Sequence, residues 1–177
     1  MDHQGMESHQ GDINALLDLV REFGVKTVVE VGTWTGATAC RLADAGCSVT
    51  CIDWFRGQED PADHIGHHRE FHVMYGAFQK NAGDRLWRTI FPVVAETTGA
   101  DWIQGPFDMA FIDADHRYEN CRADIVRWAP CIRRGGIIAC HDYEEAFPGV
   151  MRAVDELMGE WDKQKTVAAH SLAWWRM

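Results

Sequence analysis

Strand-like and helix-like segments alternate along almost the whole chain, and this alternation constrains the fold more than any other feature. The apolar runs, such as the β-branched run at residues 27–31, are short and continuous, as expected of parallel strands buried on both faces. Segments with apolar side chains at near-helical spacing separate these runs. The pattern predicts one α/β domain over residues 1–177: a doubly wound, mostly parallel sheet of seven strands, with helices on both faces and an antiparallel C-terminal strand.

The expected elements follow from these runs and from the glycines between them. Asp12 is the expected N-cap of a first helix that ends at Gly24. Gly135-Gly136 is expected to turn the chain into the fifth strand. The expected strands are 27–31, 48–52, 90–95, 107–112, 137–140, 166–168 and 172–176, and the later helices are 35–45, 71–82, 119–129 and 150–158.

Composition and charge exclude several classes of function. The formal net charge of −10 repels phosphate backbones, so we expect a small-molecule substrate and no nucleic-acid partner. Most of the six cysteines lie in apolar runs, which favours reduced thiols and a cytoplasmic protein. Residues 1–10 lack the apolar stretch of a signal peptide, and no apolar run is long enough to cross a bilayer.

A glycine turn follows the first expected strand in residues 28–36, VVEVGTWTG. Gly32 can turn sharply, and Gly36 allows close packing where the next helix begins. Trp34 stands where a dinucleotide fingerprint has its middle glycine, which makes room for a pyrophosphate. Glu30 can accept hydrogen bonds from an ammonium group. The turn therefore suits S-adenosylmethionine (SAM) better than NAD, although a plain strand–turn–helix is the alternative.

An acid also ends the second expected strand. Asp53 lies 21 residues beyond Gly32, and an acid at this place can bind both ribose hydroxyls of a nucleoside. A turn or helix-cap aspartate is the alternative. The glycine turn and Asp53 together favour the binding function.

Two acids and a histidine follow the fourth expected strand. Asp113 and Asp115 point the same way if the chain stays extended, and such a pair can bind a hard divalent cation. His116 is a candidate general base, because its pKa lies near the working pH. The alternative is that these acids cap the next helix.

His141 and Asp142 end the fifth expected strand. Strands four and five should be neighbours in a parallel sheet, so Asp113, His141 and Asp142 are expected to converge on one metal ion with oxygen and nitrogen ligands. The alternative is that His141 packs under a loop while Asp142 caps a turn.

Residues 56–70 form an expected loop flanked by Trp54, Phe55 and Phe71, which could be a lid over an acceptor site. Four histidines lie in or beside it. Zinc would need three or four converging ligands, so a solvated or substrate-facing loop is the preferred interpretation. These histidines are His64, His67, His68 and His72.

The segments VVEVGTWTGATA, CIDWF, FIDADHRYENCRADIVRWAPCIRRGGIIACHDY and PGVMRAVDEL resemble the small class I SAM-dependent methyltransferases. The resembling group includes macrolide-sugar O-methyltransferases and cephalosporin-hydroxylase-like proteins. The resemblance implies a Rossmann-like sheet, SAM as cofactor, a ribose contact at Asp53 and an adenine contact at Glu96. At the position of His141, the metal-dependent relatives tend to have a carboxylate. This difference implies that the metal is softer than Mg²⁺, is bound more weakly, or is absent. The implied cofactor residues are Glu30, Gly32, Thr33, Gly36, Asp53, Trp54, Glu96 and Asp113.

These features predict a methyltransferase that acts on a small hydroxylated acceptor. His116 and Asp115 are the expected catalytic residues, with Mg²⁺ or another divalent cation at Asp113, His141 and Asp142. A catalytically silent SAM- or nucleotide-binding module and an NAD-dependent oxidoreductase are the alternatives. The acceptor is not identified, and the oligomeric state is open between a monomer and a homodimer.

Overall fold

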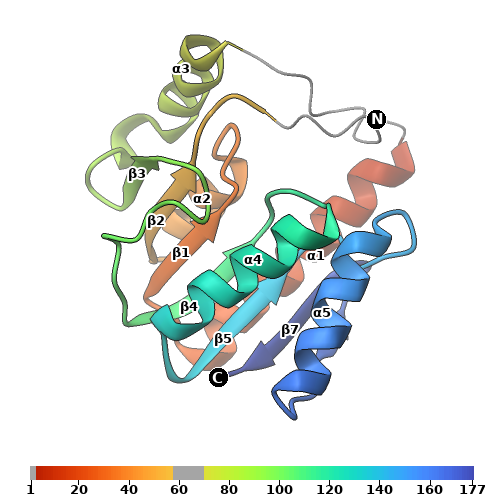
Figure 1. Cartoon of the computed structure of the whole chain (residues 1–177). Coiled ribbons are helices and arrows are strands. Elements are labelled where there is room, and N and C mark those ends of the chain that lie inside the picture. The colour runs from red at the N-terminus through yellow and green to blue at the C-terminus, as the bar shows by residue number, and fades with distance from the viewer. Residues whose placement is uncertain (1–2, 58–69) are drawn as a thin grey trace.

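A seven-stranded sheet forms the centre of the molecule (Figure 1). The computed structural model describes residues 3–57 and 70–177. The strand order is β3-β2-β1-β4-β5-β7-β6; the first five are parallel, and β7 runs antiparallel to β5 and β6. The strands are β1 (Thr27–Val31), β2 (Ser48–Asp53), β3 (Ile90–Val94), β4 (Phe107–Ile112), β5 (Ile132–Cys140), β6 (Thr166–Ala168) and β7 (Leu172–Arg176). The predicted sheet is confirmed.

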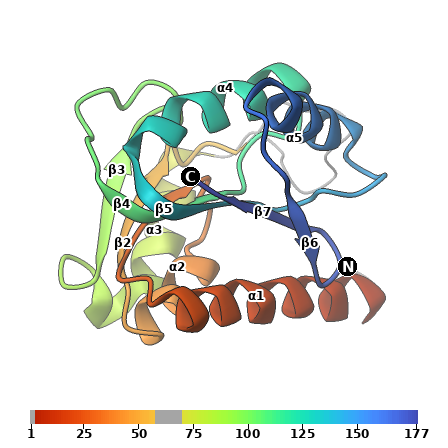
Figure 2. The same cartoon turned by 90° about the horizontal axis from the view of Figure 1, so that it is seen from below.

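Helices cover both faces of this sheet (Figure 2). Successive strand residues alternate between the faces, so Val28 packs in one core and Val29 in the other. The first three helices lie on the face of Val28, and the last two lie on the face of Val29. The helices are α1 (His3–Phe23), α2 (Ala37–Asp44), α3 (Phe71–Ala82), α4 (Tyr118–Trp128) and α5 (Pro148–Glu160).

The apolar runs predict most element bounds correctly. Strands β1, β4, β6 and β7 and helix α3 have the predicted bounds, and β2, β3, α2, α4 and α5 shift by one or two residues. Trp128 is fully buried and anchors α4, as expected. The loop at residues 56–70 and the histidines at 64, 67 and 68 lie almost wholly outside the described residues.

The prediction for the fifth strand is wrong at its start. Strand β5 begins at Ile132 and continues through Gly135 and Gly136 instead of turning there. The pairing with β4 shifts register between Phe107 and Met109, and a Cβ atom on Gly136 would lie 2.7 Å from the Asp108 carbonyl oxygen. The glycines therefore allow a close, irregular pairing of the two strands.

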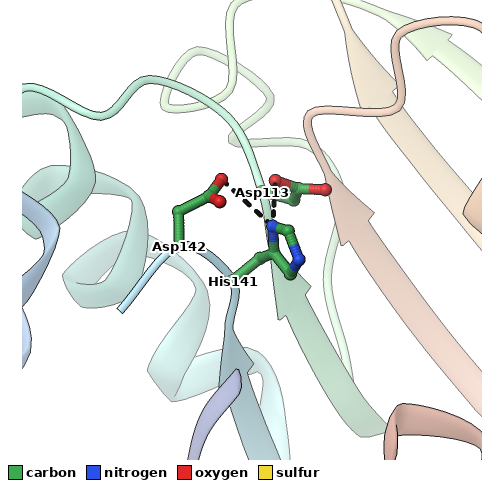
Figure 3. A group of neighbouring side chains, drawn as sticks. All are labelled: Asp113, His141 and Asp142. Atoms are coloured by element: carbon green, nitrogen blue, oxygen red, sulfur yellow. Dashed lines mark ion pairs between the residues drawn. The ribbon is translucent and has the colours of Figure 1, made fainter. Parts of the chain in front are cut away.

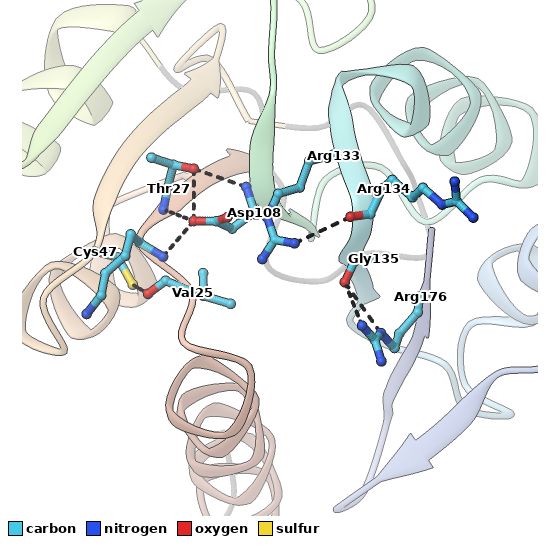
Figure 4. A network of polar contacts seen from close by, with 9 residues as sticks. Val25, Thr27, Cys47, Asp108, Arg133, Arg134, Gly135 and Arg176 are labelled. Atoms are coloured by element: carbon cyan, nitrogen blue, oxygen red, sulfur yellow. Dashed lines mark hydrogen bonds and ion pairs between the residues drawn. The ribbon is translucent and has the colours of Figure 1, made fainter.

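Asp108 joins three strands at the edge opposite the carboxyl ends (Figure 4). Its carboxylate accepts hydrogen bonds from the backbone N–H groups of Lys26 and Thr27, at 2.8 and 2.9 Å, and pairs with the Arg133 guanidinium. Burial raises the pKa of Asp108, but Arg133 and the backbone donors outweigh this and lower it to about 2. The starts of β1, β4 and β5 are thus held together by one ionised side chain.

Candidate functional site

A cavity of about 710 Å³ lies at the carboxyl ends of β1, β2, β4 and β5. Open α/β sheets bind ligands at this edge, at the point where the strand order changes direction. Here the chain runs outward from β1 to β3 and then crosses to β4 on the other side of β1. Backbone hydrogen bonds from Asp113 to Val31 and from His141 to Ile112 keep the strand ends in register. The cavity has two parts: a turn-side half around the β1 and β2 ends, and a histidine-side half around the β5 end.

Gly32 begins the turn-side half and touches the chain after β4. Its φ is 85°, and a Cβ atom there would lie 2.3 Å from the Asp113 carbonyl oxygen. Gly36 has φ 78°, and its Cβ would lie 2.7 Å from the Phe78 ring. Both glycines are thus required by close packing, and Gly36 performs the packing role expected for it.

Asp53 ties the two turns of this half together. Its carboxylate accepts hydrogen bonds from the backbone N–H groups of Thr33 at 2.9 Å, Trp34 at 2.6 Å and Phe55 at 2.6 Å. A carboxylate has about four acceptor positions, so one remains for a ligand. Burial raises the pKa of Asp53, and these three donors oppose the rise.

Glu30 lies beneath the glycine turn and is 1% exposed. The Thr33 hydroxyl donates a hydrogen bond to its carboxylate at 2.8 Å. Burial raises the pKa of Glu30 to about 8, so the group is largely protonated at pH 7. A cation placed in the cavity would favour its ionised form.

Trp54 and Glu96 complete the predicted turn-side residues. The Trp54 indole N–H donates to the Gly57 carbonyl oxygen at 2.8 Å, and its side chain lines the cavity. Glu96 also lines the cavity but is exposed to solvent.

An acid–histidine cluster joins the two halves (Figure 3). His141 Nδ1 lies 3.0 Å from an Asp142 carboxylate oxygen and 3.4 Å from an Asp113 oxygen. One potential ligand atom from each residue lies within 4.8 Å of the others. The structure therefore brings together the residues that the sequence predicted to converge.

This cluster fits a divalent cation in its donor set. Metal-binding histidines usually give their other ring N–H to a carboxylate, and His141 Nε2 lies 3.5 Å from Asp12 Oδ2. Burial lowers the pKa of His141, but Asp113, Asp12 and Asp142 outweigh it and raise the pKa well above its ordinary value. A cation on Nδ1 would take the place of that proton.

His116 lies beside the cluster. Its Nε2 is 2.9 Å from Asp142 Oδ2, and its ring centroid is 4.2 Å from that of Phe147. Burial raises the pKa of Asp142, but His116 and His141 lower it below its usual range. The pair resembles a general base oriented by an acid.

Asp115 also lines the cavity but does not belong to the cluster of Asp113, His141 and Asp142. Its carboxylate accepts hydrogen bonds from the Arg117 backbone N–H at 2.8 Å and from Asn120 Nδ2 at 2.6 Å. It therefore stabilises the turn that precedes α4, as the capping alternative described. Burial raises its pKa, and Arg117 and Asn120 lower it by more.

Asp12 is not an N-cap, because α1 begins at His3 and continues past it. Its carboxylate accepts hydrogen bonds from the backbone N–H groups of His170 and Ser171, both at 2.9 Å, and from the Ser171 hydroxyl. Burial raises the pKa of Asp12, but His141 and Ser171 outweigh this and lower it to about 2. The sequence does indicate this burial, because Asp12 lies four residues before Leu16 and so falls on the apolar face of the helix.

The architecture and the site at the carboxyl ends of the strands define a Rossmann-like enzyme of the methyltransferase class. A family model described as a methyltransferase domain matches residues 29–143, and the chain belongs to this family. A search of curated proteins gives no match.

Solved structures share the fold. The O-methyltransferase NovP is 19% identical, with 96% of this chain and 79% of NovP covered and a TM-score of 0.66. TomG from Streptomyces achromogenes, an O-methyltransferase solved with SAM, is 18% identical, with 95% and 79% covered and a TM-score of 0.65. An rRNA methylase from Streptococcus thermophilus is 15% identical, with 93% and 95% covered and a TM-score of 0.66. No helix in the described ranges is long and apolar enough to cross a membrane.

Proposed function

We propose that the chain is a SAM-dependent O-methyltransferase that acts on a small hydroxylated acceptor. One observation carries the proposal: a single cavity joins a glycine turn and a strand-end acid to a cluster of acids and imidazoles, with Asp113 between them. Membership of the methyltransferase family favours this function over an NAD-dependent oxidoreductase.

The turn-side half is the proposed cofactor site. The remaining acceptor position of Asp53 suits a ribose hydroxyl, with Trp54 beside it. Buried Glu30 suits the ammonium of the methionine part, because that cation stabilises its ionised form. The backbone at Gly32, Thr33 and Gly36 shapes this end of the cavity, and Glu96 lies at its rim.

The histidine-side half is the proposed acceptor site. SAM supplies a methyl group on a sulfonium, and the protein must place the acceptor oxygen in line with that carbon. His116 takes the proton of the acceptor hydroxyl, and Asp142, 2.9 Å from His116 Nε2, stabilises the resulting imidazolium. Asp115 positions the turn that carries His116 through its bonds to Arg117 and Asn120.

Asp113, His141 and Asp142 are the residues that would hold a divalent cation, which lowers the pKa of a bound hydroxyl. An imidazole ligand suits Mn²⁺, Co²⁺ or Zn²⁺ better than Mg²⁺. Asp12 would keep the His141 ring oriented through Nε2.

The net charge of the chain favours a small acceptor. In the histidine-side half, the carboxylates of Asp12, Asp142 and Glu144 are paired with imidazoles, so the half has no large positive field to attract phosphates. Together with the formal net charge of −10, this supports a small molecule over a nucleic acid, although the fold is shared with an rRNA methylase. Six free cysteines favour a cytoplasmic location.

The decisive experiment measures binding and methyl transfer separately. Calorimetry with SAM and S-adenosylhomocysteine (SAH) should show binding, and labelled SAM should methylate a member of a panel of sugars, phenols and aminoglycosides. An rRNA fragment in the panel tests the nucleic-acid acceptor. Activity and Mn²⁺ binding are then compared before and after chelation. Failure to bind SAM or SAH would overturn the proposal, whereas binding without transfer would favour the silent module.

A further inference from the structure

Asp124 is a buried acid in the cavity wall that the proposed function does not use. It lies on α4, is 1% exposed and lines the cavity. Among the described residues, neither carboxyl oxygen has a donor in hydrogen-bond geometry. Buried polar groups are nearly always hydrogen-bonded, so an unpartnered carboxyl in a cavity wall points to a missing ligand.

The loop after β3 is fastened to α4 around this carboxyl. The Trp128 indole N–H donates to the Thr97 carbonyl oxygen at 3.0 Å, and Arg127 donates to the Ala100 carbonyl oxygen at 2.8 Å. The Thr97 side chain lies next to Asp124. Helix α4 and the loop after β3 therefore fix the position of the Asp124 carboxyl together.

The location corresponds to the outer end of the turn-side half. Asp53 ends β2, and the loop that carries Thr97 follows β3, the next strand outward. Asn120 and Ala123 of α4 line the cavity on the same side as Asp124. A nucleoside whose ribose lies at Asp53 would extend its base towards this end.

The chemistry of the carboxyl suits a particular edge of a base. Burial raises the pKa of Asp124 to about 7, and the nearby Thr97 side chain, which is close but not in hydrogen-bond geometry, lowers it in part. A protonated carboxyl has one donor and one acceptor, so it could turn to fit either adenine or hypoxanthine. The ionised carboxylate has acceptors only. It accepts a hydrogen bond from the N6–H of adenine and repels the O6 carbonyl that replaces this amino group in an inosyl ligand.

We propose that Asp124 recognises the amino edge of adenine and makes the site selective for adenosyl over inosyl ligands. This inference rests on the proposed binding of SAM. Asp124 then has a greater effect on base recognition than Glu96, since Glu96 is exposed and exchanges its contacts with water at little cost.

The test compares SAH with its deaminated analogue, S-inosylhomocysteine, by calorimetry. Wild-type protein should prefer SAH by about 10- to 100-fold, since a mismatched buried polar group costs about 1–3 kcal/mol. Asp124→Asn should lose this preference, because the amide has both a donor and an acceptor and can turn to fit either base. Glu96→Gln should keep the wild-type preference.

Retention of the wild-type preference in Asp124→Asn, or its loss in Glu96→Gln, would overturn the inference alone. Failure of the wild-type protein to bind either nucleoside would overturn the proposed function together with it. A measurement that needs no variant uses the N6,N6-dimethyl analogue of SAH, which lacks both N6–H donors. The wild-type protein should bind it at least about tenfold more weakly than SAH, and equal affinity would overturn the inference.

Discussion

The two halves of the cavity are built in different ways. In the turn-side half, backbone groups within about one βαβ unit meet Asp53, which accepts three backbone N–H bonds. In the histidine-side half, side chains converge from distant segments, with Asp12 of α1 bonded to Ser171 before β7. Local sequence can specify the first kind of site. The second depends on how the whole domain packs.

The largest expected effect comes from a substitution at Gly32, where the two halves of the cavity meet. Gly32→Ala places a methyl group against the Asp113 carbonyl oxygen, 2.3 Å away. We expect a loss of about 4 kcal/mol or more in the free energy of unfolding, measured by urea denaturation. Gly24→Ala is the matched control: its φ is +62° and nothing lies within 4 Å, so it should cost only about 1–2 kcal/mol. Equal losses would show that the contact is unimportant.

His116→Ala separates the halves by function. Removal of the proposed base should reduce turnover by about 10²–10⁴-fold, while SAH affinity stays unchanged because His116 lies on the acceptor side. Turnover is measured with labelled SAM and the acceptor that the panel identifies. Unchanged turnover would remove His116 from the mechanism, and a matching fall in SAH affinity would show that the halves are not separable.

Glu30→Gln tests the turn-side half through pH. The pKa of Glu30 is about 8 in the folded protein against an ordinary value of 4.5. Its protonated form favours folding, so wild-type stability should fall as pH rises from about 4.5 to about 8. The glutamine variant should lose this slope and become more stable than wild type at pH 8. Parallel stability curves from urea titrations at pH 5, 7 and 8 would contradict the expectation.

Asp12→Asn tests the histidine-side half in the opposite direction. The pKa of Asp12 is lowered to about 2 from 3.8, so its contribution to stability is present above pH 3.8 and is lost as pH falls towards 2. The variant should therefore be less stable than wild type at pH 7, and this difference should shrink in acid. Asp18→Asn, on the exposed side of the same helix, should change stability by less than about 0.5 kcal/mol. A pH-independent difference for Asp12→Asn would refute the ion-pair explanation.

The sequence predicted the strands well because each buried parallel strand must be apolar on both sides. It misjudged β5, whose first part carries Arg133, Arg134 and two glycines and does not have a strand's composition. It placed Asp113, His141 and Asp142 together because neighbouring strand ends meet at one edge.

The sequence analysis did not identify Asp12 or Asp124 as site residues, for the same physical reason. A buried acid inside a helix has only a weak local signature, its place on the apolar face, because its surroundings come from other elements: Ser171 for Asp12 and the loop after β3 for Asp124. Asp115 shows the reverse case. Its short-range bonds to Arg117 and Asn120 follow ordinary turn chemistry, which the capping alternative had already described.

The contact at Gly32 also has a mechanical consequence. Where the two parts of the cavity meet, the main chains at Gly32 and Asp113 are in direct contact, because no side chain lies between Gly32 and the Asp113 carbonyl. Side-chain rotation cannot change this spacing, and strand hydrogen bonds hold both segments. If one molecule binds in the turn-side half and another in the histidine-side half, the distance between them would therefore be fixed by the rigid backbone at this contact. Loops at the rim could then change without altering that distance.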